Sequence, residues 1–475
     1  MRRWLRLGVA AIAVAGLLAA CGGEEEAPAT TTATPTSSAT ATPRAAVTPT
    51  PTPKATVTPK ATATPTPTPT VAPAAGLGKL AFVREGDIWV LDVDSGQERQ
   101  LTTDAGAQAP RWSPDGQWVA FRKVQTGELW VVRADGSGAT QVEESALGRA
   151  AWAPNNDRLA YADAKGALMV VDVDSGQRQQ ISPAGKEVGR FAWFPDGERL
   201  VLEMQEQADE ATPGPGRPRG QGLWLVNADG TGLIELRAVF VPDSADLGTL
   251  SPDGRWLTLW EGMASASLRA DGLALRIMSA AGGEPQEIAS ATLLGPGFVV
   301  WSPEGDRLAV VEGGGRQTWA NKQIVVMRPD GSDRRVVSDA GRADLFPAWS
   351  PDGRRLAFAS MEAIPPGTVD EQTQANLLNR RIWSMNPDGS DKRQLTNDPA
   401  YVDQFPQWSA DGSRIMFVRQ PTDAIRLGGE EPTPVEIWLM RADGTDQRKA
   451  ATGLSEWWLG YYGFVDWGQL LDWHR

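Results

Sequence analysis

The chain of 475 residues has only one cysteine, Cys21, and only one histidine, His474. A single cysteine allows no disulfide within the chain, so the folded part has to rely on its apolar core. We interpret His474, next to the last residue, as an exposed tail residue, which leaves no histidine for a Ser-His-Asp triad or a histidine-based metal site. The nucleophile pattern G-x-S-x-G is also absent. We therefore expect no catalytic residue.

Complete calcium-binding loops are missing too. The stretches at 92–96 and 172–176 both read Asp-Val-Asp-Ser-Gly, like the start of such a loop. The loop needs Gly at its sixth position and Glu at its twelfth. Both stretches have Gln at the sixth, and Thr103 or Pro183 at the twelfth. We interpret them as hairpin turns, and we expect no bound metal and no cofactor.

The main part of the chain lacks an excess of positive charge. The net charge of the whole chain is −13, and residues 1–77 carry six basic and three acidic side chains, or +3. Residues 78–475 therefore carry −16. A domain this acidic repels phosphate backbones and anionic lipid, which argues against binding to nucleic acid or adsorption to a membrane surface.

The N-terminus has the pattern of an export signal. Three arginines precede an apolar run from Leu7 to Ala20, which is too short to span a membrane but suits a signal peptide. The run ends in Leu-Ala-Ala-Cys, with the cysteine at position 21, and this resembles the bacterial lipobox. The alternative is an ordinary signal peptide cut after Ala19-Ala20. We expect residues 1–20 to be the signal and Cys21 to be lipidated, anchoring the protein outside the cytoplasm to the cell membrane or outer membrane.

Residues 21–77 follow the signal and are rich in Thr, Pro and Ala. Such a segment buries too little apolar surface to offset the entropy lost on folding, so we expect a disordered tether. We assign the folded domain to residues 78–475.

The folded domain repeats one short stretch. Trp-Ser-Pro-Asp-Gly stands at 112–116 and 349–353, with close variants beginning at 152, 193, 250, 301 and 408. Successive copies are 40, 41, 57, 51, 48 and 59 residues apart, a spacing typical of solenoids and propellers. Within each unit, short β-rich runs alternate with two compact turns, and this predicts four strands per unit.

The residue types that recur in the turn can be explained by backbone geometry and hydrogen bonding. Ser can cap the turn, Pro fixes φ at the second position and Gly adopts the positive φ that ends it. Trp recurs at equivalent positions of the units, where large flat side chains pack one twisted sheet on the next. We therefore interpret most of the twenty tryptophans as core residues.

These units resemble the WD40-like repeats of TolB-type β-propellers over residues 78–475. The resemblance implies an all-β propeller with four-stranded blades. We count eight blades, with seven as the alternative. The innermost strand of the first blade is missing from its place in the sequence, and we expect residues 463–468 (Gly-Phe-Val-Asp-Trp-Gly) to supply it from the C-terminus.

In such a propeller the tight turns lie on one face and the other connections on the opposite face. The long insertions fall between second and third strands, at about 205–221, 261–273, 313–322, 361–380 and 420–436. Long loops gathered on one face are where binding residues usually lie. We expect the aromatic residues and one carboxylate of two neighbouring connections to form a binding rim there: Tyr401, Asp403, Trp457, Trp458, Tyr461 and Tyr462. The alternative is that these residues pack the closing blade.

Two function hypotheses follow. The first is a monomeric, lipid-anchored binding module whose loop-rich face docks a protein or an envelope polysaccharide. The second is a glycan- or lactone-processing enzyme that uses carboxylates in the central funnel. Paired carboxylates about 5–10 Å apart in the funnel would favour the enzyme, whereas a loop-rich face without such a pair would favour the binding module.

Overall fold

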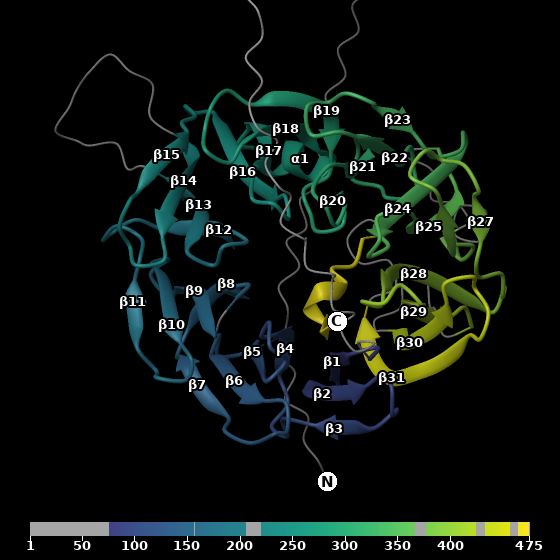
Figure 1. Cartoon of the computed structure of the whole chain (residues 1–475), viewed down its shortest axis with the longest axis horizontal. Coiled ribbons are helices and arrows are strands. Elements are labelled where there is room, and N and C mark those ends of the chain that lie inside the picture. The colour runs from purple at the N-terminus through teal and green to yellow at the C-terminus, as the bar shows by residue number, and fades with distance from the viewer. Residues whose placement is uncertain are drawn as a thin grey trace, which may run out of the picture. The chain divides into compact units, whose positions relative to one another are not determined.

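The computed structural model describes residues 76–155, 157–205, 220–365, 377–423, 433–456 and 464–474. Cys21, the expected signal peptide and nearly all of the tether lie outside these ranges. The described residues form eight four-stranded antiparallel sheets arranged in a ring, so the prediction of an eight-bladed propeller is confirmed (Figure 1). No described helix is long and apolar enough to cross a membrane.

We number the blades I to VIII in chain order and give their strands from the innermost to the outermost. Blade I contains β32 (Leu471–His474), β1 (Lys79–Arg84), β2 (Asp87–Asp92) and β3 (Glu98–Gln100). Blade II contains β4 (Ala107–Trp112), β5 (Trp118–Lys123), β6 (Leu129–Arg133) and β7 (Thr140–Glu143). Blade III contains β8 (Ala146–Trp152), β9 (Arg158–Asp163), β10 (Leu168–Asp172) and β11 (Arg178–Gln180). Blade IV contains β12 (Val188–Trp193), β13 (Arg199–Gln205), β14 (Gln221–Asn227) and β15 (Ile234–Arg237).

The second half of the ring repeats the pattern. Blade V contains β16 (Asp243–Leu250), β17 (Trp256–Met263), β18 (Leu273–Ser279) and β19 (Gln286–Thr292). Blade VI contains β20 (Val299–Trp301), β21 (Leu308–Glu312), β22 (Gln323–Met327) and β23 (Arg335–Val336). Blade VII contains β24 (Arg342–Trp349), β25 (Leu356–Glu362), β26 (Arg381–Met385) and β27 (Arg393–Gln394). Blade VIII contains β28 (Tyr401–Trp408), β29 (Arg414–Pro421), β30 (Thr433–Arg441) and β31 (Arg448–Glu456).

The repeated turn is built as the sequence predicts. In blade VII the hydroxyl of Ser350, which is buried, donates to the Asp352 carboxylate at 2.5 Å and accepts the backbone N–H of Arg355 at 2.9 Å. Gly353 follows with φ of 66°, a conformation that glycine adopts at no steric cost. The Ser-to-Asp hydrogen bond recurs at Ser113, Ser251 and Ser409.

The repeated tryptophan joins neighbouring blades. In blades III, IV, VII and VIII its indole N–H donates to a main-chain oxygen of the preceding innermost strand, as from Trp152 to Arg111 at 3.0 Å and from Trp193 to Ala151 at 2.9 Å. Trp408 repeats the bond to Ala348 at 3.1 Å. Because the rest of the indole packs in the apolar core between sheets, one side chain supplies both burial and a directional link.

The C-terminus closes the ring, but through a different segment from the one predicted. β32 pairs antiparallel with β1, from Lys79 opposite His474 to Phe82 opposite Leu471. Phe464 and the residues up to the short 3-10 helix η1 (Trp467–Gln469) precede that strand instead of forming it, and Gly463 lies outside the described residues. The reason is that Trp473, and not Trp467, occupies the place of the repeated tryptophan. The expectation of an exposed tail at His474 is also wrong, because His474 is the last residue of β32.

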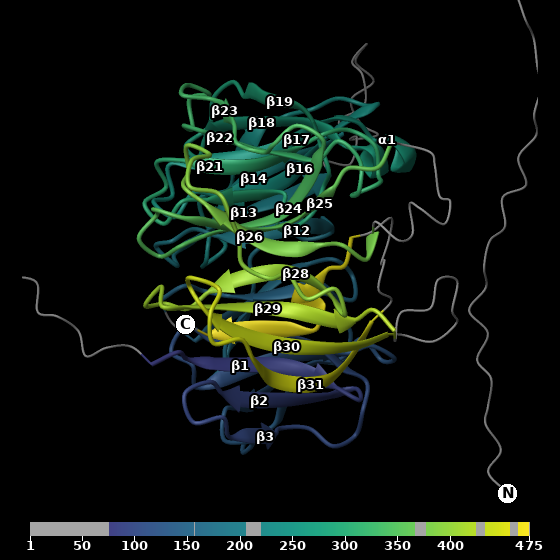
Figure 2. The ribbon, with the colours of Figure 1, turned by 90° about the vertical axis from the view of Figure 1, so that its right-hand side faces the viewer.

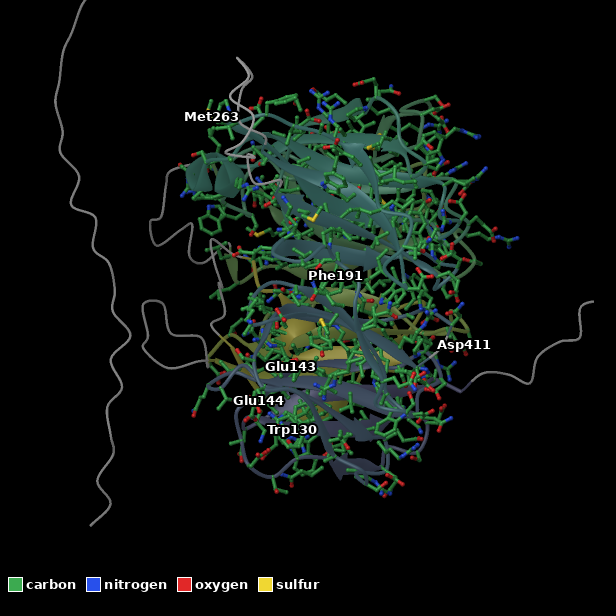
Figure 3. The ribbon with its side chains drawn as sticks, turned by 90° about the vertical axis from the view of Figure 1, so that its left-hand side faces the viewer. Trp130, Glu143, Glu144, Phe191, Met263 and Asp411 are labelled. Carbon is green, nitrogen blue, oxygen red and sulfur yellow. The ribbon has the colours of Figure 1, made fainter. Side chains whose placement is uncertain are left out.

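The ring has two unlike faces. We call the face that carries the tight turns the turn face and the opposite one the loop face. The short helix α1 (Ala266–Asp271), between β17 and β18, lies on the loop face, while β1 begins on the turn face near the C-terminus (Figure 2). Met263, on the loop face, and Asp411, in a tight turn, accordingly lie on opposite sides of the molecule (Figure 3).

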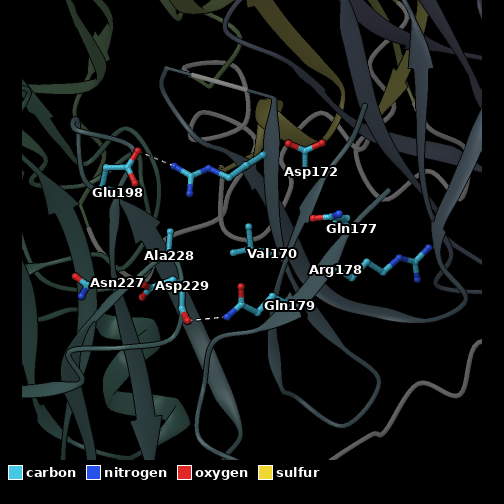
Figure 4. A pocket seen from close by; sticks show the side chains of 10 residues that line it. Val170, Asp172, Gln177, Arg178, Gln179, Glu198, Asn227, Ala228 and Asp229 are labelled. Atoms are coloured by element: carbon cyan, nitrogen blue, oxygen red, sulfur yellow. Dashed lines mark hydrogen bonds and ion pairs between the residues drawn. The ribbon is translucent and has the colours of Figure 1, made fainter. Parts of the chain in front are cut away.

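Grooves also run between neighbouring blades on the turn face. The one between blades III and IV has a volume of about 380 Å³ (Figure 4). It is crossed by a hydrogen bond from Gln179 to the Asp229 carbonyl at 2.6 Å and by an ion pair between Arg158 and Glu198. A similar groove lies between blades VI and VII. Because such grooves recur with the repeat, we interpret them as part of the scaffold.

Candidate binding site in the central channel

Two of the predicted binding residues are placed by the structure. Tyr401 and Asp403 lie in β28, the innermost strand of blade VIII, and not in the connection where they were expected. The other predicted rim residues, Trp457, Trp458, Tyr461 and Tyr462, lie outside the described residues. The preceding strand β31 extends to Glu456, so residues 453–456 belong to a strand instead of the predicted connection.

Asp403 and Tyr401 are part of a packed cluster. Asp403 is completely buried, and its carboxylate accepts two hydrogen bonds from Arg419, at 2.6 Å from Nε and 2.9 Å from a terminal nitrogen. The Arg419 guanidinium also lies over the rings of Tyr401 and Trp438, at 4.6 and 4.4 Å from their centroids. Both oxygens of Asp403 are therefore occupied by Arg419. Tyr401 is half-buried, so part of its ring is accessible to solvent.

The central channel shows a second pattern, at the residue three places before each repeated tryptophan. Blades III and IV have arginine at this position, Arg149 and Arg190. Blades VI, VII and VIII have phenylalanine there, namely Phe298, Phe346 and Phe405. Since these positions lie on or next to the innermost strands, one arc of the channel is cationic and the opposite arc is aromatic.

The C-terminal segment lies against the aromatic arc (Figure 1). The ring of Phe464 is 5.1 Å from that of Phe298 and 5.8 Å from that of Phe346, measured between centroids. Phe346 and Phe405 have φ of 53° and 55°, a left-handed conformation that costs a non-glycine residue about 1–2 kcal/mol. Each sits in a bulge of its strand, and the same bulge recurs at Ala109 in blade II with φ of 54°.

The same segment reaches the cationic arc with polar atoms. Asp466 forms an ion pair with Arg149, and Arg111 donates to the Gly468 carbonyl at 2.6 Å. A Cβ built on Gly468 would lie 3.3 Å from Arg111, 3.3 Å from Asp466 and 3.7 Å from Arg149. Two guanidinium groups and one carboxylate therefore converge on this glycine.

The channel remains open beside blades III and IV. Leu147 is 47% exposed, and Gly148, Gly189 and Arg190 are exposed as well, although all four belong to innermost strands. A Cβ on Gly148 would meet no atom within 4 Å. The innermost strands of blades VII and VIII, in contrast, have no exposed residue. The C-terminal segment therefore fills one half of the channel and leaves the arginine half accessible.

Electrostatics single out the arginine half. Burial, together with the neighbouring Arg111 and Arg190, lowers the pKa of Arg149 to about 10. Arg190 forms no ion pair with a described residue, and its guanidinium makes one long hydrogen bond, 3.4 Å to the Leu247 carbonyl. Beneath it, burial raises the pKa of Glu203, which accepts the backbone N–H groups of Arg190 and Leu247. This half of the channel is suited to binding an anionic group.

The loop face next to the aromatic arc has its own apolar cluster. Trp319 and Ile364, from the insertions of blades VI and VII, pack with strand residues that include Met361 and Val402. Lys322 is fully buried beside this cluster, and its ammonium donates to the carbonyls of Gly314, Gly315 and Ala320 at 3.1, 2.9 and 3.4 Å. Burial lowers the pKa of Lys322 to about 8. The described parts of these insertions are therefore anchored to the blades.

The carboxyl groups that the C-terminal segment brings to the channel are both engaged. Asp466 pairs with Arg149, and Asp472 accepts the backbone N–H of Trp112 at 2.8 Å. Within the described ranges, no group of three or more His, Cys, Asp or Glu residues could hold a metal ion. The two calcium-like stretches form hairpin turns, as expected, with Asp92 accepting the backbone N–H of Ser95 at 2.9 Å.

Sequence reasoning missed the arginine half because it concentrated on the loops. The signal was nonetheless in the repeat, since alignment of the innermost strands on their tryptophans places Arg149 beside Arg190. What the alignment could not show is that the C-terminal segment leaves these residues accessible.

These features define the chain as an eight-bladed β-propeller with an accessible cationic half-channel. No family model matches the chain. One segment is 30% identical over 136 residues to an uncharacterized protein of Agrobacterium fabrum, covering 24% of this chain and 46% of that protein. Another is 31% identical over 123 residues to the Tol-Pal system protein TolB of Anaeromyxobacter dehalogenans, covering 21% of this chain and 25% of TolB. The chain thus spans less than half of the length of these curated relatives.

Two solved structures show a similar fold. Dihydro-heme d1 dehydrogenase NirN aligns with a TM-score of 0.53 at 14% identity, over 81% of this chain and 76% of NirN. Dipeptidyl peptidase 4 of Porphyromonas gingivalis aligns with a TM-score of 0.50 at 11% identity, over 78% of this chain and 56% of the peptidase. At these identities the likeness is one of fold alone.

Proposed function

We propose that this chain is an exported, lipid-anchored propeller that binds a protein or an envelope polysaccharide through its loop face. In this proposal Cys21 carries the anchor and the domain works outside the cytoplasm. The accessible arginine half of the channel, with Arg149 and Arg190, receives an anionic group of the partner. The observation that carries the proposal is the open cationic half-channel in a domain whose net charge is strongly negative.

The physical argument concerns unmatched charge. Residues 78–475 carry −16, yet the charges of Arg111 and Arg190 act on Arg149, and the one ion pair of these three arginines with a described residue joins Arg149 to Asp466. Like charges held together repel unless a counter-charge offsets them. Guanidinium groups bind carboxylates through two parallel hydrogen bonds. Within the chain itself, Arg149 already attracts one carboxylate, that of Asp466, through a single contact.

Two further features support binding over catalysis. The insertions of blades VI and VII are anchored by the Trp319 cluster, so the loop face offers a firm platform beside the channel. The enzyme hypothesis calls for two carboxylates that face each other, whereas Asp466 and Asp472 are each held by a donor. Tyr401, Trp457, Trp458, Tyr461 and Tyr462 stay in the proposal as the aromatic rim of the surface.

The test uses one charge reversal on each face. Arg190→Glu places a carboxylate in the channel without breaking an ion pair with a described residue. Arg255→Glu makes the same change on the turn face, where the Arg255 side chain is 71% exposed. Partner capture from envelope extract should fall at least tenfold for Arg190→Glu and stay unchanged for Arg255→Glu, with both variants melting like the parent. If both variants capture the partner equally well, the channel is not part of the binding surface.

A further inference from the structure

Four large apolar side chains are exposed at the loop-face end of blade V, and we call them the apolar patch. Phe240 and Val241 come just before β16. Met263 is the last residue of β17, and Leu268 lies in α1 (Figure 3). All four are between 43% and 49% exposed. Large apolar side chains gathered on the surface of a folded domain mark an interaction site.

Hydrogen bonds hold the two segments that carry the patch. The Ala264 N–H donates to the Pro242 carbonyl at 2.7 Å, which joins one segment to the other. Arg269 ties α1 to β16, because it donates to both oxygens of the Asp246 carboxylate, at 2.6 and 2.7 Å. No side chain of α1 is buried, so Leu268 is not part of the core. The patch is therefore fixed in place while its apolar surface stays accessible.

The patch leads into the arginine half of the channel. β16 begins at Asp243, next to the patch, and is the innermost strand of its blade. Four residues further along, the Leu247 carbonyl accepts the hydrogen bond from Arg190 at 3.4 Å. At about 3.3 Å per residue, this places the exposed Arg190 about 13 Å from the patch. Apolar surface and a cation without an ion pair to a described residue thus lie along one strand.

This separation indicates the chemistry of a ligand. In an extended peptide, residues i and i+4 lie on the same face and about 13 Å apart. An apolar side chain at i can therefore contact the patch while a carboxylate at i+4 reaches Arg190. Val241, Met263 and Leu268 are not flat, and such side chains pack well against other apolar side chains. Sugar rings stack best on flat aromatic rings, so the patch favours a protein over a polysaccharide.

We propose that the loop face binds an extended segment of a partner protein, with an apolar side chain on the patch and a carboxylate four residues later at Arg190. This inference rests on the proposed function and narrows the partner of the same surface to a protein. Charge complementarity supports it, because residues 78–475 carry −16 and would repel an acidic segment over most of their surface.

Two peptides test the spacing. Both are amidated, carry fluorescein at the N-terminus and are titrated with the full-length mature protein in detergent while anisotropy is followed. The first, Leu-Ser-Phe-Thr-Ser-Thr-Glu, has Phe and Glu four residues apart, and we expect a dissociation constant of about 10–100 µM. In the second, Leu-Ser-Phe-Thr-Ser-Glu-Thr, the carboxylate moves to the opposite face, and binding should weaken about tenfold. Since the two peptides have the same composition and charge, detergent affects both equally.

Variants of the protein test the two contacts separately. Arg190→Glu should weaken binding of the first peptide at least tenfold, and Leu268→Ser about fivefold. Leu233→Ser is the matched control: Leu233 is 37% exposed in the turn before β15, on the turn face, and this variant should bind like the parent. Melting curves verify the fold, and Met263→Ser replaces Leu268→Ser if the latter melts early.

The outcomes separate this inference from the proposed function. The inference is overturned if the two peptides bind equally, or if Leu268→Ser and Leu233→Ser bind the first peptide equally. It is also overturned if the anionic polysaccharide alginate binds through Arg190 while the first peptide does not bind. In that case the proposed function stands and its partner is a polysaccharide. If neither peptide nor alginate binds and partner capture does not depend on Arg190, both proposals fail.

Discussion

Several charged side chains of this propeller are buried, and each has a specific partner. Asp403 is held by Arg419, and Lys322 by a set of backbone carbonyls. Removing a charge from water is costly unless hydrogen bonds and counter-charges replace the lost hydration. These residues therefore act as fixed points that join strands and insertions at the loop-face end of blades VI to VIII.

The Asp403–Arg419 pair gives a first prediction. Asp403→Ala leaves the Arg419 guanidinium buried without its carboxylate, and we expect the free energy of unfolding to fall by about 3–5 kcal/mol. Denaturant titration measures the change. The double variant Asp403→Ala/Arg419→Met should regain part of the loss, because it also removes the orphaned charge. If Asp403→Ala instead melts normally but no longer captures the partner, Asp403 acts in binding after all.

Lys322 gives a prediction about pH. Its pKa is lowered from 10.5 to about 8 in the folded protein, so between these values the unfolded chain binds the extra proton. The contribution of Lys322 to stability therefore increases as the pH rises from about 8 towards 10.5. Thermal unfolding at several pH values should show this rise in the parent and in the exposed-site control Lys165→Met. In Lys322→Met the rise should be absent, and an identical pH profile would contradict the assignment.

At the scale of single elements, the strand that closes the ring is the most informative. β32 contributes four residue pairs to β1, and its side chains reach blade II through Asp472 and His474. Without it, β1 would have an open edge and blades I and II would lose their innermost contacts. An exposed strand edge of this kind is also a template for aggregation.

The third prediction is the effect of removing that strand. Truncation after Leu470 should lower the melting temperature by more than any single surface substitution does, because it removes a whole strand from the core. Deleting residues 22–69, which lie outside the described residues, is the control and should leave melting unchanged. A truncated protein that melts like the parent would show that β32 is dispensable for closure.

The repeat sequence encodes most of these elements. The repeats predicted eight blades and a closing C-terminal strand, because each turn and its tryptophan form a short local motif that can be counted along the chain. The closing strand was misplaced because Trp467 and Trp473 both match the repeat, and only pairing with β1 distinguishes them. The candidate site was harder, since the burial of Asp403 and the accessibility of Arg190 depend on segments far away in the sequence.

At the scale of the whole molecule, the two faces of the propeller differ in the segments that they carry. The propeller begins on the turn face, where Leu77 bonds to Asp94 and to Trp473. The anchored insertions belong to the loop face, and the arginine half-channel lies along the innermost strands β8 and β12. If residues 21–77 act as the proposed tether, a chain that enters the propeller on the turn face would leave the loop face free to reach partners away from the proposed anchor.

The fourth prediction concerns the proposed lipid anchor at Cys21. Cys21→Ala removes the thiol that a lipobox needs, so the protein should be released from the membrane fraction or remain unprocessed. Fractionation followed by immunoblotting measures the change, with Ser37→Ala in the tether as the control that should stay with the membrane. Mature Cys21→Ala protein in the membrane fraction would point to another mode of attachment.

The position of β1 has a mechanical consequence. A propeller that holds a partner while its tether is taut would receive the pull at Lys79, the first residue of β1. That strand lies between β2 and β32, with six residue pairs on one side and four on the other. Because hydrogen bonds in antiparallel pairs run across the strands, a pull along β1 would load both ladders in shear, and they would share the force. The closing strand would thus double as a mechanical clamp on the tethered end.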